Sequence, residues 1–394
     1  MTRIRDKAAV VGIGQTEFSA SSGRGETRLA LEAITAALAD AGIKPSEVDG
    51  IVRYGVAQHG VSDAWVAHNL GVKDLRLAVS LDYGGSQAAA MVGQAAMAVA
   101  TGAANVVVGY RSLNGSSGRR PGSSDTYVLY KDEDPNYDNF LMPAGFTAPI
   151  QMYAVAARRM MHEYGTTAAQ LAEVAVVARD YASRNPKAQM FGRPLTREQC
   201  RDAEMIASPL RKFDCCIRTD GAVAFVVTSS ERARHLRQPP VYVKAASQGS
   251  ATDIQGPLYS YVGRPDLLDT SGFATARNIY DAAGMRPSDI DVAQLYDCFT
   301  VTLLMALEAY GFCEPGESGA FVEAGNLGLG GTIPTNTAGG HLSEGYLHGV
   351  NHVLEGVRQM RGSSTSQVDG AQTCLVTSGL PVPTSALILG KTQG

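Results

Sequence analysis

The chain has 394 residues, which is long enough for two or three domain-sized units with a large hydrophobic core. Its 45% hydrophobic and 18% charged residues are typical of a globular protein, and a net charge of −4 without any long run of Lys or Arg argues against nucleic acid or an anionic membrane as a partner. No apolar run approaches the roughly 20 residues of a membrane helix, the N-terminus lacks the features of a signal peptide, and six scattered cysteines predict no disulfide framework, so we expect a cytoplasmic protein.

The first part of the chain alternates between apolar runs and helical patterns. Residues 7–13, 50–54, 77–81 and 106–108 are predicted strands, and residues 27–41 and 87–100 are predicted helices. Gly42 stands where the first of these helices needs a C-terminal cap. Because helices alternate with fully apolar strands, we expect an α/β protein whose parallel-rich sheet is covered on both faces.

The middle of the chain has a different composition. Residues 112 to about 143 are rich in Gly, Ser, Asp and Tyr and predict a long excursion over the surface. Residues 153–164 and 168–183 have helical patterns. Residues 208–228 then predict a loop and a strand that returns to the sheet.

A nine-residue segment occurs twice, as A-G-I-K-P-S-E-V-D at 41–49 and A-G-M-R-P-S-D-I-D at 283–291. Every position matches by identity or chemical class, and each copy follows a predicted helix and precedes an apolar strand. The same offset carries Tyr54 onto Tyr296. We infer a duplicated α/β unit, with an N-terminal half at 1–240 that includes the excursion at about 112–210, and a C-terminal half at 241–394.

Two loops of the C-terminal half each carry a tyrosine. The stretch N-T-A-G-G-H-L-S-E-G-Y-L-H-G at 336–349 places glycines and polar side chains between an apolar run and a predicted helix at 350–360. Glycine gives such a loop freedom to adopt positive φ and lets a ligand approach the backbone. The second loop is Q-L-Y-D-C-F-T at 294–300. Loops at strand ends commonly hold the chemistry of α/β proteins, so Tyr296 and Tyr346 are candidate functional residues, with a mobile surface turn as the alternative for 336–349.

With the duplicated unit and these two loops, the chain resembles the thiolase superfamily, and most closely its sterol-carrier-protein-type branch with the thiolase-like lipid-transfer proteins. Residues 294–299 are similar to that branch's H-D-C-F loop, and residues 336–346 are similar to its N-P-S-G-G-x-x-S-x-G-H-P loop. Cys374 stands where the family keeps the cysteine of its last active-site loop. The resemblance covers nearly the whole chain and implies the thiolase fold, in which duplicated α/β halves form a five-layer αβαβα sandwich.

The chain departs from the thiolase pattern at the catalytic positions. A thiolase needs a nucleophilic cysteine early in the chain, at a helix N-terminus, whereas residues 81–87 read L-D-Y-G-G-S-Q and the first cysteine is Cys200. Ser86 lies in no G-x-S-x-G elbow and is expected to cap the helix instead. Tyr296 and Tyr346 replace the two imidazoles that a thiolase places around its thioester oxygen. Acyl transfer through a cysteine thioester is therefore not expected.

Two phenols in an acyl-CoA pocket suit the retro-aldol cleavage of a β-hydroxyacyl-CoA, a reaction that needs no nucleophile. Tyrosine-bearing lipid-transfer proteins of this group are linked to the shortening of a steroid side chain. The resemblance thus implies a bulky steroid thioester as substrate, and a ketone and a short acyl-CoA such as propionyl-CoA as products. It implies that Tyr296 takes the β-hydroxyl proton while Tyr346 stabilises the enolate and returns a proton to the α-carbon, but the sequence leaves the reverse order open. No cofactor is expected beyond the CoA of the substrate.

The resemblance also implies partners. A second copy of the chain is expected to form a homodimer, because an open hydrophobic strand edge invites association. A small protein with a zinc ribbon and an OB-like fold is the second expected partner.

Two residues are supporting candidates at this site. His348 is a candidate helper that polarises Tyr346, with a structural histidine as the alternative. Cys374 is a candidate proton shuttle, as in the family, or an inert core residue.

Weaker motifs point to other ligands. Gly12 and Gly14 begin a dinucleotide fingerprint, but Glu17 replaces its third glycine. His348 and His352 have i, i+4 spacing without an obvious third ligand, so no metal is expected. The pair Arg158-Arg159 is a candidate contact for the CoA phosphates, or simply a solvated helix face.

Two alternatives to an aldolase remain at this stage. One is a non-catalytic lipid or acyl-CoA carrier or scaffold that kept the pocket after losing the cysteine, and the other is an atypical thiolase with an unexpected nucleophile. The paired tyrosines favour the aldolase, because a decaying site has no reason to place the same phenol in both former imidazole positions.

Overall fold

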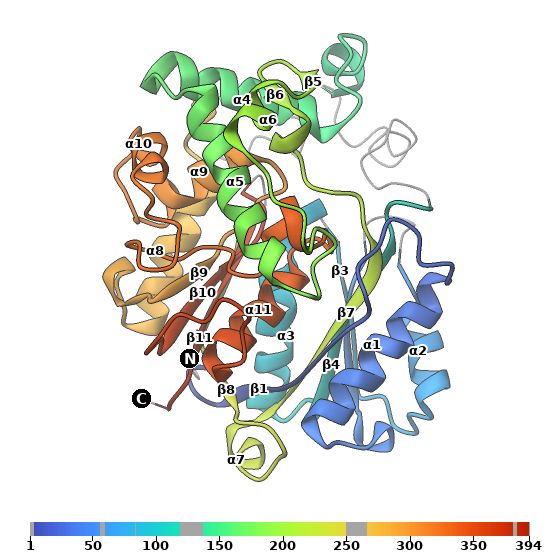
Figure 1. Cartoon of the computed structure of the whole chain (residues 1–394). Helices are drawn as coiled ribbons and strands as arrows, with labels where there is room; N and C mark the ends of the chain where they lie inside the picture. The colour runs from blue at the N-terminus through green and yellow to red at the C-terminus, as the bar shows by residue number, and fades with distance from the viewer. Residues whose placement is uncertain are drawn as a thin grey trace.

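A mixed nine-stranded sheet runs through the computed structural model, which describes residues 4–55, 60–82, 84–118, 137–249, 266–380 and 384–393 (Figure 1). The strand order is β3-β2-β4-β7-β1-β8-β11-β10-β9. These strands are β1 (Ala8–Gln15), β2 (Gly50–Tyr54), β3 (Leu77–Leu81), β4 (Val106–Asn114), β7 (Asp220–Ser229), β8 (Val241–Gly249), β9 (Val292–Gln294), β10 (Thr373–Thr377) and β11 (Thr384–Gly390). A separate hairpin pairs β5 (Met205–Ala207) with β6 (Leu210–Arg211).

The helices of the described residues surround and divide this sheet. They are α1 (Glu26–Ala41), α2 (Asp63–Leu70), α3 (Ala88–Thr101), α4 (Pro149–Tyr164), α5 (Ala168–Arg184), α6 (Arg197–Arg201), α7 (Ser230–Ala233), α8 (Ser271–Ala283), α9 (Thr300–Ala309), α10 (Ser318–Glu323) and α11 (Val350–Arg361). None of them is both long and apolar enough to cross a membrane.

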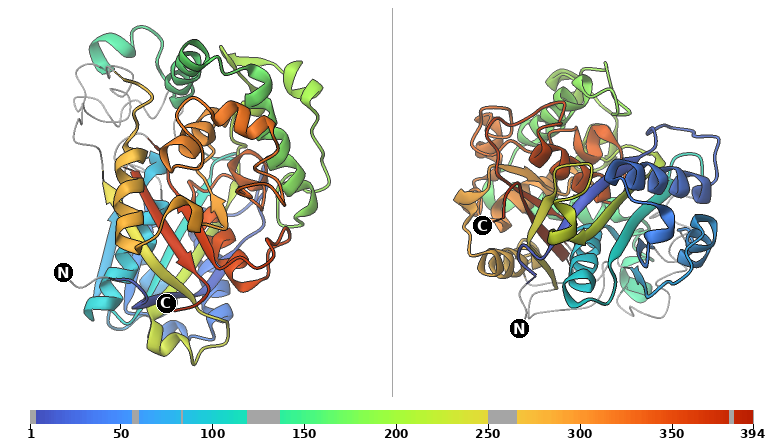
Figure 2. Two further views of the ribbon diagram at one scale, coloured as in Figure 1. Left: turned by 90° about the vertical axis from the view of Figure 1, so that its left-hand side faces the viewer. Right: turned by 90° about the horizontal axis from the view of Figure 1, so that it is seen from below.

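The layers follow from which helix packs on which face. Helices α3 and α11 lie in the centre, where both contact strands of the N-terminal and C-terminal parts of the sheet (Figures 1 and 2). Helix α1 covers the outer face of β1, β4 and β7, and α8 covers the outer face of β8 and β11. The sheet is continuous only through two residue pairs between β1 and β8, and its two parts enclose the central helices. This arrangement confirms the expected five-layer αβαβα sandwich.

The strand order repeats across the two parts of the sheet. In the first part, the strands in chain order are β1, β2, β3, β4 and β7, and they lie in the order third, second, fourth, fifth, first. The second part, β9-β10-β11-β8, has the same order, with the third strand reduced to a bridge between Thr335 and Ala293. In each part, all strands but one run in the same direction, and the exceptions are β7 and β11.

The repeated nine-residue segment folds the same way twice. Helix α1 ends at Gly42 with φ of 72°, and α8 ends at Gly284 with φ of 63°, so both glycines adopt the left-handed conformation of a C-terminal cap. Each is followed by a short 3₁₀ turn, Pro45–Glu47 or Pro287–Asp289, in which an acidic side chain accepts a backbone hydrogen bond. The turn then leads into β2 or β9.

The structure adds to the sequence-based predictions at three places. Residues 63–70 form α2, which the pattern did not predict. The predicted surface excursion begins later than expected, because β4 continues to Asn114, and its residues 119–136 lie outside the described part of the chain. Gly12 and Gly14 serve packing: a Cβ at either position would overlap a backbone carbonyl of α1, at Ala37 or Ala33.

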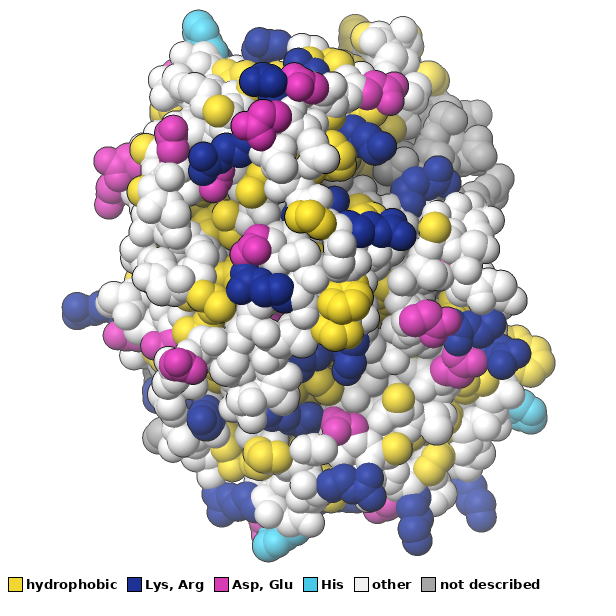
Figure 3. Space-filling model, in the orientation of Figure 1, with side chains coloured by type: hydrophobic (Ala, Val, Ile, Leu, Met, Phe, Trp, Pro, Cys, Tyr) yellow, Lys and Arg dark blue, Asp and Glu magenta, His cyan; other side chains and the backbone are white. Residues whose placement is uncertain are grey.

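The middle of the chain packs over the C-terminal half. Helix α5 contacts α9, α10 and the π-helical turn Gly340–Glu344, and α4 contacts α9 (Figure 1). Arg179 of α5 donates to Ser343 Oγ at 2.9 Å, so this segment holds down one of the tyrosine loops. On the face seen in Figure 3, basic and acidic side chains are interspersed.

Candidate active site

Tyr296 and Tyr346 meet at the ends of two neighbouring loops. Tyr296 follows β9, and Tyr346 follows the turn Gly340–Glu344. Their hydroxyl oxygens are 3.0 Å apart, which is a hydrogen bond that either phenol can donate. Tyr296 is only 2% exposed, whereas Tyr346 is half-buried, so Tyr346 is the more accessible of the two phenols.

The two loops are fastened by side chains of the predicted motifs. The Asn336 side chain accepts from the Leu295 backbone N–H at 2.7 Å and donates to the Leu295 carbonyl at 2.8 Å. The backbone N–H of Tyr296 donates to Thr377 Oγ1, and that of Tyr346 donates to Thr219 Oγ1, both at 3.0 Å. These hydrogen bonds fix the backbone of both loops and so hold the two phenols within hydrogen-bonding distance of each other.

Gly85, in the cysteine-free stretch that enters α3, makes room for the phenol of Tyr296. A Cβ at Gly85 would fall 3.0 Å from Cε2 of Tyr296 and would overlap its Cζ and hydroxyl oxygen. The Gly85 carbonyl accepts from the Gly379 backbone N–H at 3.0 Å, which fixes this close approach. The tyrosine thus occupies the space that any side chain at position 85 would need.

The sequence predicted that Ser86 caps the N-terminus of α3, and this prediction is wrong. The first backbone N–H groups of the helix instead donate to side chains of the C-terminal half: Ala89 N to Ser378 Oγ at 3.1 Å, and Ala90 N to Ser385 Oγ at 3.2 Å. The two serine hydroxyls are joined at 2.9 Å. Tertiary contacts therefore satisfy the amides that a local cap would otherwise take.

His348 lies beside Tyr346, with the ring centroids 4.7 Å apart. Its Nδ1 accepts from Nε and Nη2 of Arg111 at 3.3 and 3.2 Å. Arg111 is a fully buried residue of β4 and also donates to the Tyr54 carbonyl at 3.0 Å. Tyr54 packs edge-on against His348 and under the guanidinium, so it belongs to the surroundings of the site and is not remote from it.

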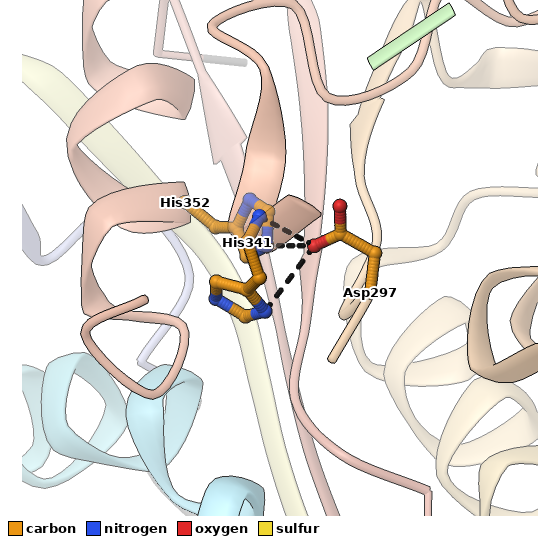
Figure 4. Close-up of side chains that lie close together, drawn as sticks. All are labelled: Asp297, His341 and His352. Carbon is orange, nitrogen blue, oxygen red and sulfur yellow. Dashed lines mark hydrogen bonds and ion pairs between the residues drawn. The ribbon is translucent and has the colours of Figure 1, made fainter. Parts of the chain in front are cut away.

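Next to the phenols lies a buried cluster of Asp297, His341 and His352 (Figure 4). Asp297 Oδ1 is 3.2 Å from Nδ1 of His341 and 3.1 Å from Nε2 of His352, and it also accepts from the His341 backbone N–H at 2.9 Å. The His341 ring packs edge-on against both Tyr296 and Tyr346, with centroids 4.6 and 5.0 Å away. Burial lowers the pKa of His341 well below its usual value, which favours a neutral ring.

The same three side chains are the group of described residues that could hold a metal ion, because their donor atoms all lie within 4.8 Å of one another. Two imidazoles and a carboxylate suit zinc or iron(II). Asp297 also accepts hydrogen bonds from the His352 ring and from the His341 backbone N–H, so part of its hydrogen-bonding capacity is satisfied without an ion. The sequence expectation of no metal stays a prediction.

Burial dominates the acid–base properties of the phenol pair. Desolvation raises the pKa of both Tyr296 and Tyr346 well above their usual value, and the neighbouring phenol raises that of Tyr296 further. Two hydrogen-bonded phenols share their protons, so they titrate as a pair. As neutral groups they can donate hydrogen bonds to an oxyanion; acting as a base requires a positive charge nearby.

Cys374 does not join this site. Its side chain is fully buried near the start of β10, where its sulfur lies near Gly356 of α11 and Leu375. The segment of β10 that reaches Tyr296 begins at Thr377, three residues or about 10 Å further along the strand. Of the two alternatives for Cys374, this burial favours an inert core residue over a proton shuttle.

Sequence reasoning missed Arg111, Asp297 and His341. A signal for Arg111 was present, because an arginine interrupts the apolar strand V-V-V-G-Y-R-S-L at 106–113. A charged residue that is buried in a strand needs a local partner, and its partner is one of the proposed site residues. Asp297 and His341 belong to the two motif loops, but nothing in their spacing predicts that they meet.

A cavity of about 610 Å³ lies next to α4. Its lining includes Arg158, Arg159, His162 and Ser208. The predicted arginine pair thus faces an open cavity, although none of the lining residues belongs to the phenol pair.

The sequence matches two family descriptions. Residues 8–231 match "Thiolase, N-terminal domain", and residues 258–391 match "Thiolase C-terminal domain-like". Over 387 residues, the chain is 46% identical to the 17-hydroxy-3-oxo-4-pregnene-20-carboxyl-CoA lyase of Mycobacterium tuberculosis, covering 98% of this chain and 99% of the relative. It is 44% identical to the steroid side-chain-cleaving aldolase of Thermomonospora curvata, covering 99% of both chains.

Solved structures agree with these similarities. The structure named "Ltp2-ChsH2(DUF35) aldolase" superposes with a TM-score of 0.91 at 45% identity over 99% of both chains. Human mitochondrial 3-ketoacyl-CoA thiolase, at 14% identity, superposes with a TM-score of 0.70 over 99% of this chain and 100% of that one, a likeness that concerns the fold alone.

Proposed function

This chain belongs to the thiolase family, and we propose that it uses the family's fold for a different reaction: the retro-aldol cleavage of a steroid β-hydroxyacyl-CoA. It is a carbon–carbon lyase, as its relatives with 44% and 46% identity are named. The observation that carries the proposal is the hydrogen-bonded pair of Tyr296 and Tyr346, packed against Gly85 where no nucleophilic side chain fits.

The name of the mycobacterial relative defines a chemically suitable substrate. In a 17-hydroxy-pregnene-20-carboxyl-CoA, carbon 17 carries the hydroxyl and is bonded to carbon 20, which carries the thioester. The hydroxyl is thus β to the thioester, as retro-aldol cleavage requires. Breaking the bond between these two carbons gives a 17-ketosteroid and the three-carbon propionyl-CoA.

The reaction balances with the two phenols alone. Tyr296 as phenolate removes the proton of the β-hydroxyl, and the new carbonyl forms as the carbon–carbon bond breaks. The electron pair of that bond moves to the α-carbon and the thioester oxygen as an enolate, to which Tyr346 donates a hydrogen bond and then a proton. Transfer of the proton from Tyr296 to Tyr346 across their 3.0 Å hydrogen bond then regenerates the starting state.

The test is turnover by the purified chain, with its partner present, on 17-hydroxy-3-oxo-4-pregnene-20-carboxyl-CoA. Phe at position 296 or 346 keeps the ring and removes the hydroxyl, and we expect each change to lower kcat by about a hundred- to ten-thousandfold. Tyr280→Phe is the matched control, because this buried phenol belongs to the outer helix α8 and donates to the Tyr310 carbonyl at the end of α9. Wild-type turnover in both Tyr296→Phe and Tyr346→Phe would leave a lipid carrier as the better account.

Partners form part of the proposal. The chain covers 99% of a chain in the structure named "Ltp2-ChsH2(DUF35) aldolase", and this name includes a DUF35 protein. We propose that the present chain also binds a small partner, one with a zinc ribbon and an OB-like fold. A homodimer is proposed through β3, the outermost strand of its part of the sheet, whose residues are half-buried or exposed. Sedimentation of the chain with and without the partner tests both associations.

The proposal also covers the site that binds CoA and the cellular location of the protein. We propose that the cavity beside Arg158 and Arg159 receives the phosphates of CoA, which affinity measurements for CoA on charge-reversed variants would test. A cytoplasmic location is proposed because the six cysteines form no disulfide in the described structure, as suits a reducing compartment. Cell fractionation would test it.

A further inference from the structure

Arg111 is a cation in an unusual place. It lies in the interior of β4 with 0% exposure, and within the described residues no carboxylate forms an ion pair with it. Its hydrogen bonds go instead to the Tyr54 carbonyl and to Nδ1 of His348. A buried charge without a carboxylate partner is costly, so its position calls for an explanation.

The hydrogen bonds of Arg111 decide the protonation of His348. A guanidinium can only donate, so Nδ1 of His348 must be the unprotonated acceptor and the proton of the neutral ring sits on Nε2. The His348 backbone has φ of 55°, in the left-handed region that non-glycine residues rarely adopt. The strained backbone thus occurs at the residue whose ring centroid lies 4.7 Å from that of Tyr346.

The phenol pair needs such a cation. Both phenols lie in an environment that opposes ionisation, yet retro-aldol cleavage starts with the removal of a hydroxyl proton by a base. The guanidinium of Arg111 reaches the pair through His348, because it lies 3.2 and 3.3 Å from Nδ1 of this histidine, whose ring centroid is 4.7 Å from that of Tyr346. The other titratable groups that face Arg111 or the phenols are Glu26, Arg53, Tyr54, Cys216, Cys298 and His341.

We propose that Arg111 is a positioning residue of the reaction, which fixes His348 as a neutral Nε2–H donor beside Tyr346 and supplies the positive charge that allows the tyrosine pair to lose one proton. The inference rests on the proposed aldolase function. It assigns the activation of the phenols to the N-terminal half, whereas both phenols belong to the C-terminal half.

Four variants of the chain, assembled with its partner, test this role. Arg111→Met removes the charge at similar length, and Arg111→Lys keeps a charge. His348→Leu removes the acceptor, and the fourth variant combines Arg111→Met with His348→Leu. The matched control is Arg361→Met, since Arg361 of α11 also has a largely covered side chain, with 6% exposed, but pairs with Asp40 of α1 at 2.8 Å. The measurements are kcat and KM for 17-hydroxy-3-oxo-4-pregnene-20-carboxyl-CoA across a pH series, and the ultraviolet titration of tyrosinate in the resting protein.

Loss of the charge should move the rising limb of the kcat profile to higher pH by about one unit or more, with kcat near neutrality about tenfold lower per unit. KM should stay within about twofold, Arg111→Lys should recover part of the loss, and the double variant should be no worse than the poorer single one. The tyrosinate signal that disappears in Tyr346→Phe should shift in the same direction. Arg361→Met should leave both curves in place.

A uniform fall in kcat at every pH, or a rise in KM alone, would show that Arg111 only supports the fold and would overturn the inference. If Arg111→Met does not fold, Arg111→Lys and His348→Leu decide the question, because each leaves most of the buried volume filled. If the wild type cleaves no β-hydroxyacyl-CoA, the proposed function fails, whereas the titration of the resting protein still decides whether Arg111 controls the phenols. An unchanged titration in Arg111→Met would refute the inference whatever the activity.

Discussion

Gly85→Ala is the substitution that most directly tests the geometry of the site. The added Cβ would lie 3.0 Å from Cε2 of Tyr296 and would overlap its Cζ and hydroxyl oxygen. A normal contact needs about 3.5 Å, so the phenol must move by more than about 1 Å. That shift breaks the 3.0 Å hydrogen bond to Tyr346, because neither loop backbone is free to follow.

The cost follows from this displacement. A shift of about 1 Å in a catalytic group commonly costs about a hundredfold in rate, and full loss of a general acid or base costs about a hundred- to ten-thousandfold, or roughly 3–5 kcal/mol of barrier. Overpacking should lower the free energy of unfolding by about 1–3 kcal/mol, so the protein should still fold.

The assay is kcat of the folded, partner-bound variant on the steroid β-hydroxyacyl-CoA, beside its unfolding midpoint. Gly25→Ala is the matched control, because Gly25 is exposed with φ of −71° and a Cβ there meets nothing within 4 Å. Gly85→Ala combined with Tyr296→Phe should be no less active than Tyr296→Phe alone, since the hydroxyl is already gone. A folded Gly85→Ala protein with wild-type kcat would refute the assignment of Tyr296 to the chemistry.

Three further predictions concern Cys374, Glu344 and the cluster of Asp297 with two histidines. Cys374→Ala should change kcat by less than about twofold while lowering stability, and a labelled acyl group should not be trapped on the chain during turnover, because Cys374 lies in the core of β10. Burial raises the pKa of Glu344 to about 7, above its value in the unfolded chain. The free energy of unfolding should therefore fall as the pH rises from about 4.5 through 7, by roughly 3 kcal/mol in total. Glu344→Gln should flatten this fall when unfolding is measured across pH. Treatment with a chelator should leave turnover unchanged, and elemental analysis should find no stoichiometric metal, because Asp297 already accepts hydrogen bonds. A stoichiometric metal that is lost in Asp297→Asn would contradict this prediction.

The sequence by itself determined the elements and much of the chemistry. Short apolar runs and helical patterns predicted β2 and β3 at their observed bounds and α1 within one residue, because these patterns report local backbone geometry. The nine-residue repeat predicted the duplicated order of strands, since like segments adopt like turns. The two tyrosines were found because each replaces a residue of a short motif within one loop.

Only the tertiary structure decided which side chains converge on those tyrosines. Arg111 and His348 are 237 residues apart, and their contact exists because the central layer brings β4 against the loop before α11. Cys374 and Thr377 lie on one strand, yet the strand's rise separates the first from the site and brings the second to it. Tyr54 matched Tyr296 only as a position in a repeat, but packing placed it under Arg111. Local patterns fix the conformation of each segment, whereas the neighbours of a buried side chain depend on how distant segments pack, which no single stretch of sequence encodes.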